Sequence, residues 1–130
     1  MERLIGIPYE DRGRSTNGAD CWGLIRLAHR MLTGGDLPDY SATYASSDAP
    51  EGAAAAVRRH QAGGRYAPVA PGEERQGDII VLKVAGWPAH CGMVTRPGWM
   101  LHTLRGHDSA LERYRTPKWE RRVDAFWRPI

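Results

Sequence analysis

One amphipathic helix is the feature that most constrains the fold of this chain. Between residues 21 and 32, apolar residues recur at spacings of three, four and seven, which places them on one face of a helix. Asn17 or Asp20 can cap the N-terminus, and Gly34 and Gly35 can end the helix by adopting a positive φ. The pattern predicts a helix from Cys21 to Thr33. Its apolar stripe, which must be buried against another element, consists of Cys21, Leu24, Ile25, Ala28, Met31 and Leu32.

The pattern along the rest of the chain changes from helical to β. A capped, alanine-rich stretch predicts a second helix from Ala49 to Gln61, and β-branched runs predict the strands that follow it. Because helices come first and strands afterwards, the fold class is α+β, with the helix that carries Cys21 packed on an antiparallel sheet. The other predicted segments are a loop from Pro8 to Gly18, a linker from Tyr66 to Gln76, strands at Asp78–Val84, Ala89–Thr95, Trp99–Leu104 and Val123–Arg128, and a short helical turn around Trp119.

Length and composition exclude several classes of protein. A chain of 130 residues with 42% hydrophobic and 25% charged residues fits one globular domain, residues 1–130. No apolar run approaches the roughly 20 residues needed to span a membrane, and the N-terminus does not resemble a signal peptide, so we expect synthesis in the cytoplasm. The net charge of +3 is spread among acidic residues, which is weak support for a nucleic-acid partner.

Cys21 and a pair of histidines are the candidate catalytic residues. A cysteine in the first turn of a helix faces unpaired N–H groups and the positive end of the helix dipole, which favour the thiolate. On position alone, a core-filling cysteine is the better interpretation. His90 and His102 change this balance, because a tight turn between their strands can bring the two imidazoles together. One imidazole can then contact the thiol while the other fixes its orientation.

The remaining cysteine and histidines carry no predicted function. Cys91 follows His90 on the same strand, so it points to the opposite face and is expected in the core. The same alternation argues against a shared metal ion and against a disulfide between the two cysteines, and we expect no metal or other cofactor. His29, His60 and His107 are interpreted as ordinary polar residues.

Five short blocks in a fixed order resemble the NlpC family of papain-like cell-wall cysteine peptidases. The resemblance covers roughly residues 6 to 104. The closing segments around Trp119 and Trp127 are similar to the tails of the phage and gene-transfer-agent branch of this family. The blocks are Gly6-Ile7-Pro8-Tyr9, Gly18-Ala19-Asp20-Cys21-Trp22-Gly23-Leu24-Ile25, Gly77-Asp78-Ile79-Ile80, His90-Cys91-Gly92-Met93-Val94 and Leu101-His102.

The resemblance implies a role for each matched residue. The nucleophile of the family falls on Cys21, its base on His90 and its third polar residue on His102. Tyr9 matches a tyrosine that helps to hold the oxyanion, although simple packing is nearly as good an interpretation. Asp20 matches a residue that recognises a free amine of the substrate, and it is also placed to cap the helix. Trp22 stands where serine is common in the wider family, although the phage-like branch is similar at this position. The resemblance implies that Trp22 contacts substrate, without the contact that a serine hydroxyl would make.

The implied function is hydrolysis of the peptide stem of bacterial peptidoglycan, most often between D-glutamate and the diamino acid. Without a signal peptide, the phage-like branch implies an enzyme of a phage tail or gene transfer agent that acts in the periplasm or cell wall, with tail hub proteins as partners. An effector injected by a neighbouring cell fits the sequence equally well. Two other classes stay open: a catalytically silent tail-assembly or hub component of the same fold, and a small basic domain that binds nucleic acid.

Overall fold

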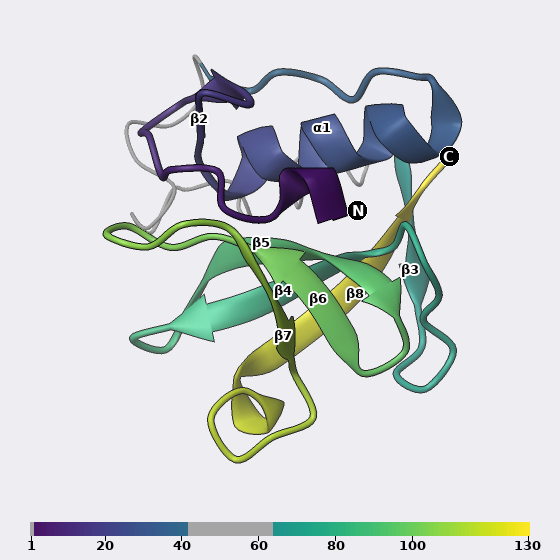
Figure 1. Cartoon of the computed structure of the whole chain (residues 1–130). Helices are drawn as coiled ribbons and strands as arrows, with labels where there is room; N and C mark the ends of the chain where they lie inside the picture. The colour runs from purple at the N-terminus through teal and green to yellow at the C-terminus, as the bar shows by residue number, and fades with distance from the viewer. Residues whose placement is uncertain (1, 42–63) are drawn as a thin grey trace.

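A six-stranded antiparallel sheet carries one long helix across one of its faces (Figure 1). The computed structural model describes residues 2–41 and 64–130, so the helix predicted at residues 49–61 lies outside the described residues. The strand order is β3-β8-β4-β5-β6-β7. The elements are η1 (Glu2–Leu4), β1 (Arg14–Ser15), β2 (Gly18–Ala19), α1 (Cys21–Thr33), β3 (Tyr66–Val69), β4 (Ile79–Val84), β5 (Trp87–Arg96), β6 (Trp99–His102), β7 (Ala110–Arg113), η2 (Glu120–Arg122) and β8 (Val123–Pro129).

The helix begins and ends where the sequence predicts. Asp20 caps α1 by accepting a hydrogen bond from the N–H of Gly23, and Gly34 ends the helix with a φ of 75°. The first four residues of the apolar stripe are buried, as expected. The expectation was wrong for the last turn, because Met31 is 45% exposed and Leu32 is 37% exposed. These two residues belong to the last turn of α1, which lies beyond the part of the helix that is buried in the core.

Alternation along the central strands divides the buried residues into two clusters. Ile79 and Val81 on β4 join the residues of α1 in one cluster, which we call the helix-side cluster. Ile80 and Leu82 face the other way and join Trp119 and Phe126 in a second cluster, the far-side cluster. The turn that carries η2 lies on the side of the sheet away from α1 (Figure 1). The sheet is therefore covered on both faces, which is why β4 is apolar at nearly every position.

The α+β class and the central strands are confirmed. The predicted hairpin joins β5 and β6 through Pro97 and Gly98, and β8 begins at the predicted Val123. Two elements correct the expectations: β3 lies in the supposed linker, where it pairs with β8, and β7 was not expected at all. The predicted N-terminal loop also contains the small β1–β2 hairpin. These strands have two to four residues, too few to show a period.

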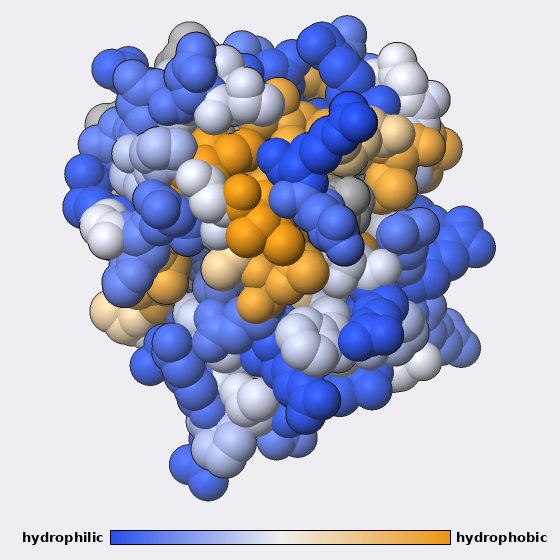
Figure 2. Space-filling view, viewed as in Figure 1, coloured by the Kyte–Doolittle hydropathy of each residue, from blue (hydrophilic) through white to orange (hydrophobic). Residues whose placement is uncertain are grey.

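The visible surface is mainly polar; apolar side chains gather near its centre, between α1 and the sheet, and smaller apolar areas lie toward its edges (Figure 2). The large apolar side chains that are more than a third exposed include Ile5, Met31 and Leu111. Among the described residues, α1 is the longest helix, and none of the helices has the length and hydropathy to cross a membrane.

Candidate active site

The N-terminus of α1 is fixed by a network around Asp20. This buried carboxylate accepts hydrogen bonds from the N–H of Gly23 at 2.8 Å and from Arg14 at 2.7 Å through the same oxygen. Gly23 has no room for a side chain, because a Cβ there would lie 2.0 Å from the carbonyl oxygen of Gly13. The loop before the helix thus packs directly on its first turn. Cys21 is the first residue of α1, and only 1% of it is exposed.

The two histidines of the β5–β6 hairpin are in direct contact. His90 Nε2 lies 2.9 Å from His102 Nδ1, and both rings are buried. Gly92 makes this approach possible, because a Cβ at that position would lie 3.2 Å from the Cβ of His102. The predicted convergence of the two imidazoles is therefore present in the structure. Steric crowding by His102 thus explains why the block His90-Cys91-Gly92 ends in a glycine.

Glu112 continues the chain of hydrogen bonds beyond His102, and this residue was not predicted from the sequence. His102 Nε2 lies 2.8 Å from Oε1 of Glu112, and Trp119 Nε1 donates to Oε2 of the same carboxylate at 2.8 Å. The ring of Trp119 lies 6.0 Å from that of His90 and 5.3 Å from that of His102. We call these four residues, His90, His102, Glu112 and Trp119, the histidine relay.

Burial and neighbouring charge keep the relay histidines neutral. Burial, together with the nearby His102, lowers the pKa of His90 to about 3. Burial also lowers the pKa of His102, although the hydrogen bond and charge of Glu112 act in the opposite direction. For Glu112 itself, hydrogen bonds from Trp119 and His102 outweigh burial and hold the pKa below its usual value. At neutral pH the relay thus consists of two neutral imidazoles and a carboxylate.

Cys91 packs in the core, as expected, and it marks where α1 meets β5. Burial raises the pKa of Cys91 well above its usual value, and the charges of Cys21 and Asp20 add to this effect. α1 packs against β5, the strand that carries both His90 and Cys91. Neither cysteine is part of a disulfide, and both belong to the helix-side cluster. Trp119, on which the imidazoles pack, belongs to the far-side cluster. His90 therefore contacts a residue of the far-side cluster, and Cys91, which follows it on β5, belongs to the helix-side cluster.

Tyr9 and Trp22 have well-defined surroundings. The hydroxyl of Tyr9 donates to Asp11 at 3.0 Å, and the guanidinium of Arg105 lies 5.3 Å from its ring centre. The indole of Trp22 is completely buried, and its Nε1 donates to the carbonyl of Pro38 at 2.8 Å. Trp22 thus has a packing role in this structure. The roles predicted for both residues in substrate or oxyanion binding stay predictions.

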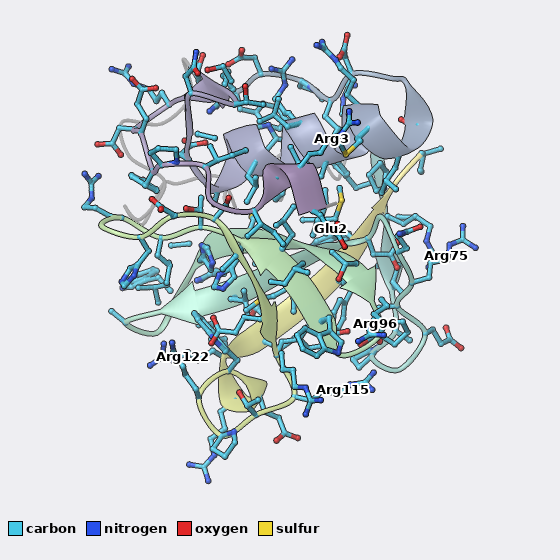
Figure 3. The ribbon with its side chains drawn as sticks, viewed as in Figure 1. Glu2, Arg3, Arg75, Arg96, Arg115 and Arg122 are labelled. Atoms are coloured by element: carbon cyan, nitrogen blue, oxygen red, sulfur yellow. The ribbon has the colours of Figure 1, made fainter. Side chains whose placement is uncertain are left out.

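Concave surfaces lie beside the relay and away from it. A cavity of about 140 Å³ is lined by His102, His107, Glu112 and Lys118, among others, so it reaches the carboxylate end of the relay. A wider one of about 690 Å³ includes Glu2, Arg3 and Arg96, which are labelled in Figure 3, and has no relay residue in its lining. In the parts of the chain that the structure describes, no three His, Cys, Asp or Glu side chains are grouped to hold a metal ion.

The neutral state of His90 predicts a loss of stability in acid. The unfolded chain binds a proton at His90 near the ordinary pKa of 6.5, whereas the folded chain does so only near 3. The free energy of unfolding should therefore fall as the pH drops below about 6.5, by up to about 1.4 kcal/mol per pH unit from this residue. Urea unfolding at several pH values measures this slope. The slope should be shallower in His90→Gln, and equal slopes in the two proteins would contradict the prediction.

Comparisons with solved structures reveal the same fold. An NLP/P60 family protein similar to a lipoprotein, from Staphylococcus aureus subsp. aureus Mu50, superposes with a TM-score of 0.66 and 20% identity, over 98% of this chain and 38% of that one. The NlpC/p60 domain of the peptidoglycan hydrolase SagA gives a TM-score of 0.63 and 18% identity, over 99% and 92% of the two chains. A P60 domain of an antigen from M. avium subspecies paratuberculosis gives 0.61 and 20%, over 99% and 88%.

These identities establish the fold and no more, and this chain spans well under half of the Staphylococcus aureus protein. No curated protein matches the chain. The sequence model of the NlpC/P60 family, however, matches residues 6–128, which is nearly the whole chain and includes the blocks around Cys21, His90 and His102. The chain therefore belongs to the NlpC/P60 family.

Proposed function

We propose that this protein is a cysteine peptidase that cuts the peptide stem of bacterial peptidoglycan. The observation that carries the proposal is the 2.9 Å contact between His90 on β5, the strand against which α1 packs, and His102 on the neighbouring strand β6. A nucleophile, a base and a group that orients the base are the elements of covalent acyl transfer. Cys21, His90 and His102 fill these three roles.

The reaction begins when the Cys21 thiol gives its proton to His90 as the sulfur attacks the peptide carbonyl. Backbone N–H groups at the start of α1 hold the oxyanion, with help from Tyr9. His90 then passes the proton to the leaving amine, and the carbon–nitrogen bond breaks to leave a thioester on Cys21. In the second half, His90 removes a proton from water as its oxygen attacks the thioester. The carbon–sulfur bond breaks to release the carboxylic acid, and the imidazolium of His90 returns the proton to the sulfur of Cys21.

Peptidoglycan as the substrate is supported by membership of the NlpC/P60 family and by the shared fold with the NlpC/p60 domain of a peptidoglycan hydrolase. We propose further that the cut falls between D-glutamate and the diamino acid. Asp20 would contribute to recognition of a free amine of the stem and Trp22 to the shape of the same region. We also propose that the protein acts in the periplasm or cell wall as part of a phage tail or gene transfer agent, on which hub proteins would hold it.

Digestion of purified muropeptides tests the proposal. Incubation with defined stem peptides should produce two fragments whose masses locate the cut, with one water added per bond. One fragment that ends in D-glutamate and one that begins with the diamino acid would identify the proposed bond. Products of other masses would still show a peptidase, but one that cuts a different bond of the stem. A folded protein that leaves every muropeptide intact at high enzyme concentration would contradict the proposal.

The burial of Cys21 favours a second candidate function, that of a catalytically silent tail-assembly or hub component. With only 1% of its surface exposed, Cys21 fits a packing role as well as a reactive one. This candidate predicts no cleavage of any muropeptide, and it predicts a thiol at residue 21 that reacts no faster than Cys91. Both outcomes separate it from the peptidase.

A further inference from the structure

We infer that Glu112 is a positioning residue that sets which nitrogen of His102, and through it which nitrogen of His90, carries a proton. The inference rests on the proposed function, because the base it prepares is the one that takes the proton of Cys21. Glu112 stands on β7, diagonal to His102 on the same face of the sheet, since His102 pairs with Ala110 in the β6–β7 register. Its carboxylate joins His102 to Trp119.

The direction of each hydrogen bond follows from the chemistry of the groups. A carboxylate only accepts hydrogen bonds, so the contact of 2.8 Å requires the proton of neutral His102 to be on Nε2. His102 Nδ1 is then a lone pair, and the contact of 2.9 Å requires a proton on His90 Nε2. The other nitrogen of neutral His90, Nδ1, is therefore left as a lone pair. The relay delivers a base with one defined free nitrogen.

This arrangement also serves the charged state of the reaction. When the thiol of Cys21 transfers its proton to Nδ1, His90 becomes an imidazolium, and the hydrogen bond from its Nε2 to His102 is unchanged. His102 remains neutral and polarised toward the carboxylate, so the negative charge of Glu112 stabilises the imidazolium through one intervening ring. No proton moves to Glu112 at any step.

Trp119 fixes the orientation of the carboxylate. Only 1% of Trp119 is exposed. Its indole N–H can only donate a hydrogen bond, and it donates to Oε2 of Glu112 at 2.8 Å. Lys118, another donor, lies 3.5 Å from the same oxygen. Two donors on Oε2 thus leave Oε1 for His102. Both oxygens of residue 112 must accept, and a carboxylate meets this requirement where an amide does not.

The substitution Glu112→Gln turns this requirement into a test. If the amide oxygen stays with Trp119, the amide NH₂ faces His102 and can bond only to a deprotonated Nε2. The proton of His102 then moves to Nδ1, the proton of His90 moves to its own Nδ1, and the base has lost its free nitrogen. If the amide oxygen instead faces His102, two donors meet at Trp119. Replacing Trp119 by Phe removes the buried donor, and the exposed side chain of Lys118 can turn away into solvent. The double variant should therefore recover the original tautomers.

Four proteins make the experiment: Glu112→Gln, Trp119→Phe, the double variant, and Glu120→Gln as the matched control. Glu120 is an exposed carboxylate next to Trp119 in the sequence and takes no part in the relay. Heteronuclear NMR of the imidazole nitrogens reports which nitrogen is protonated in the free protein, and muropeptide hydrolysis reports kcat and KM. Thermal unfolding shows whether each variant is folded.

We expect Glu112→Gln to lower kcat by about 100-fold with KM nearly constant, and to move the protons of both histidines to Nδ1. The double variant should regain at least about tenfold of kcat and the original tautomers, which a merely structural role of Glu112 would not produce. Trp119→Phe alone should lose only a few-fold, because the carboxylate still accepts from His102. Glu120→Gln should match the unaltered protein in both readouts.

Two results would overturn the inference. One is a folded Glu112→Gln protein with unchanged tautomers, whatever its activity. The other is a double variant that recovers neither the tautomers nor any activity. The NMR readout needs no hydrolysis, so failure of the proposed function is distinguishable: the unaltered protein would cut no muropeptide while its histidine protons still responded to residue 112.

Discussion

Replacement of Cys21 by Ala is expected to lower kcat/KM for muropeptide hydrolysis by about 10⁴-fold or more, because it removes the thiol that forms the thioester. Cys21→Ser should lose nearly as much, since a hydroxyl beside a neutral imidazole is a far weaker nucleophile than a thiol. Product masses after timed digestion measure both losses. Cys91→Ala is the matched control: it removes the other buried thiol, which packs in the helix-side cluster, and should change the rate by no more than about threefold.

Alkylation gives the same prediction a readout that does not depend on the substrate. A small alkylating reagent should modify Cys21 faster than Cys91 near neutral pH, because burial raises the pKa of Cys91 well above its usual value. Mass analysis of the peptides identifies the modified residue. Equal slow reaction of both thiols, or hydrolysis that survives in Cys21→Ala, would show that Cys21 is a core residue and not a nucleophile.

The elements that the sequence predicted are those whose local pattern and tertiary role agree. The helix from Cys21 to Thr33 has an apolar face, an aspartate cap and a glycine stop, and all three are present in the structure. The central strand β4 is apolar because both of its faces are covered. The edge strands β3 and β7 have four residues each and carry exposed or charged side chains, so their existence depends on the neighbouring strand and not on their own sequence.

The same difference, between elements with a local sequence pattern and strands that depend on their neighbours, decides which residues of the candidate site could be predicted. Cys21, His90 and His102 could be selected because each lies on an element that the sequence predicts, and the turn between the two strands brings the histidines together. Glu112 lies on the unpredicted β7, in a segment whose mixed charges are typical of a solvated surface. Glu112 could have been placed diagonal to His102 only if the pairing of residues between β6 and β7 had been known. That register is fixed by the folded sheet, and no local signal in the sequence specifies it.

Of the relay residues, His90 should be the most sensitive. His90→Ala removes the group that takes and returns the proton, and we expect a loss in kcat of about 10³-fold with retained folding. The variant leaves a cavity beside Trp119 and deprives His102 of a hydrogen-bond partner, so its stability must be measured alongside its activity. Full activity in a folded His90→Ala protein would remove the base from the mechanism.

Substitutions of His102 separate orientation from proton transfer. An amide in His102→Asn or His102→Gln can accept from Nε2 of His90 through its oxygen and donate to Glu112 through its nitrogen, so we expect a loss of only about tenfold. His102→Ala can do neither, and it leaves the carboxylate of Glu112 facing an empty space, so the loss should reach about 100-fold. Kinetics on one muropeptide give the order of the three variants. Equal activities would show that His102 does not orient the base, and a greater loss with the amides than with alanine would show that an amide holds His90 in the wrong tautomer.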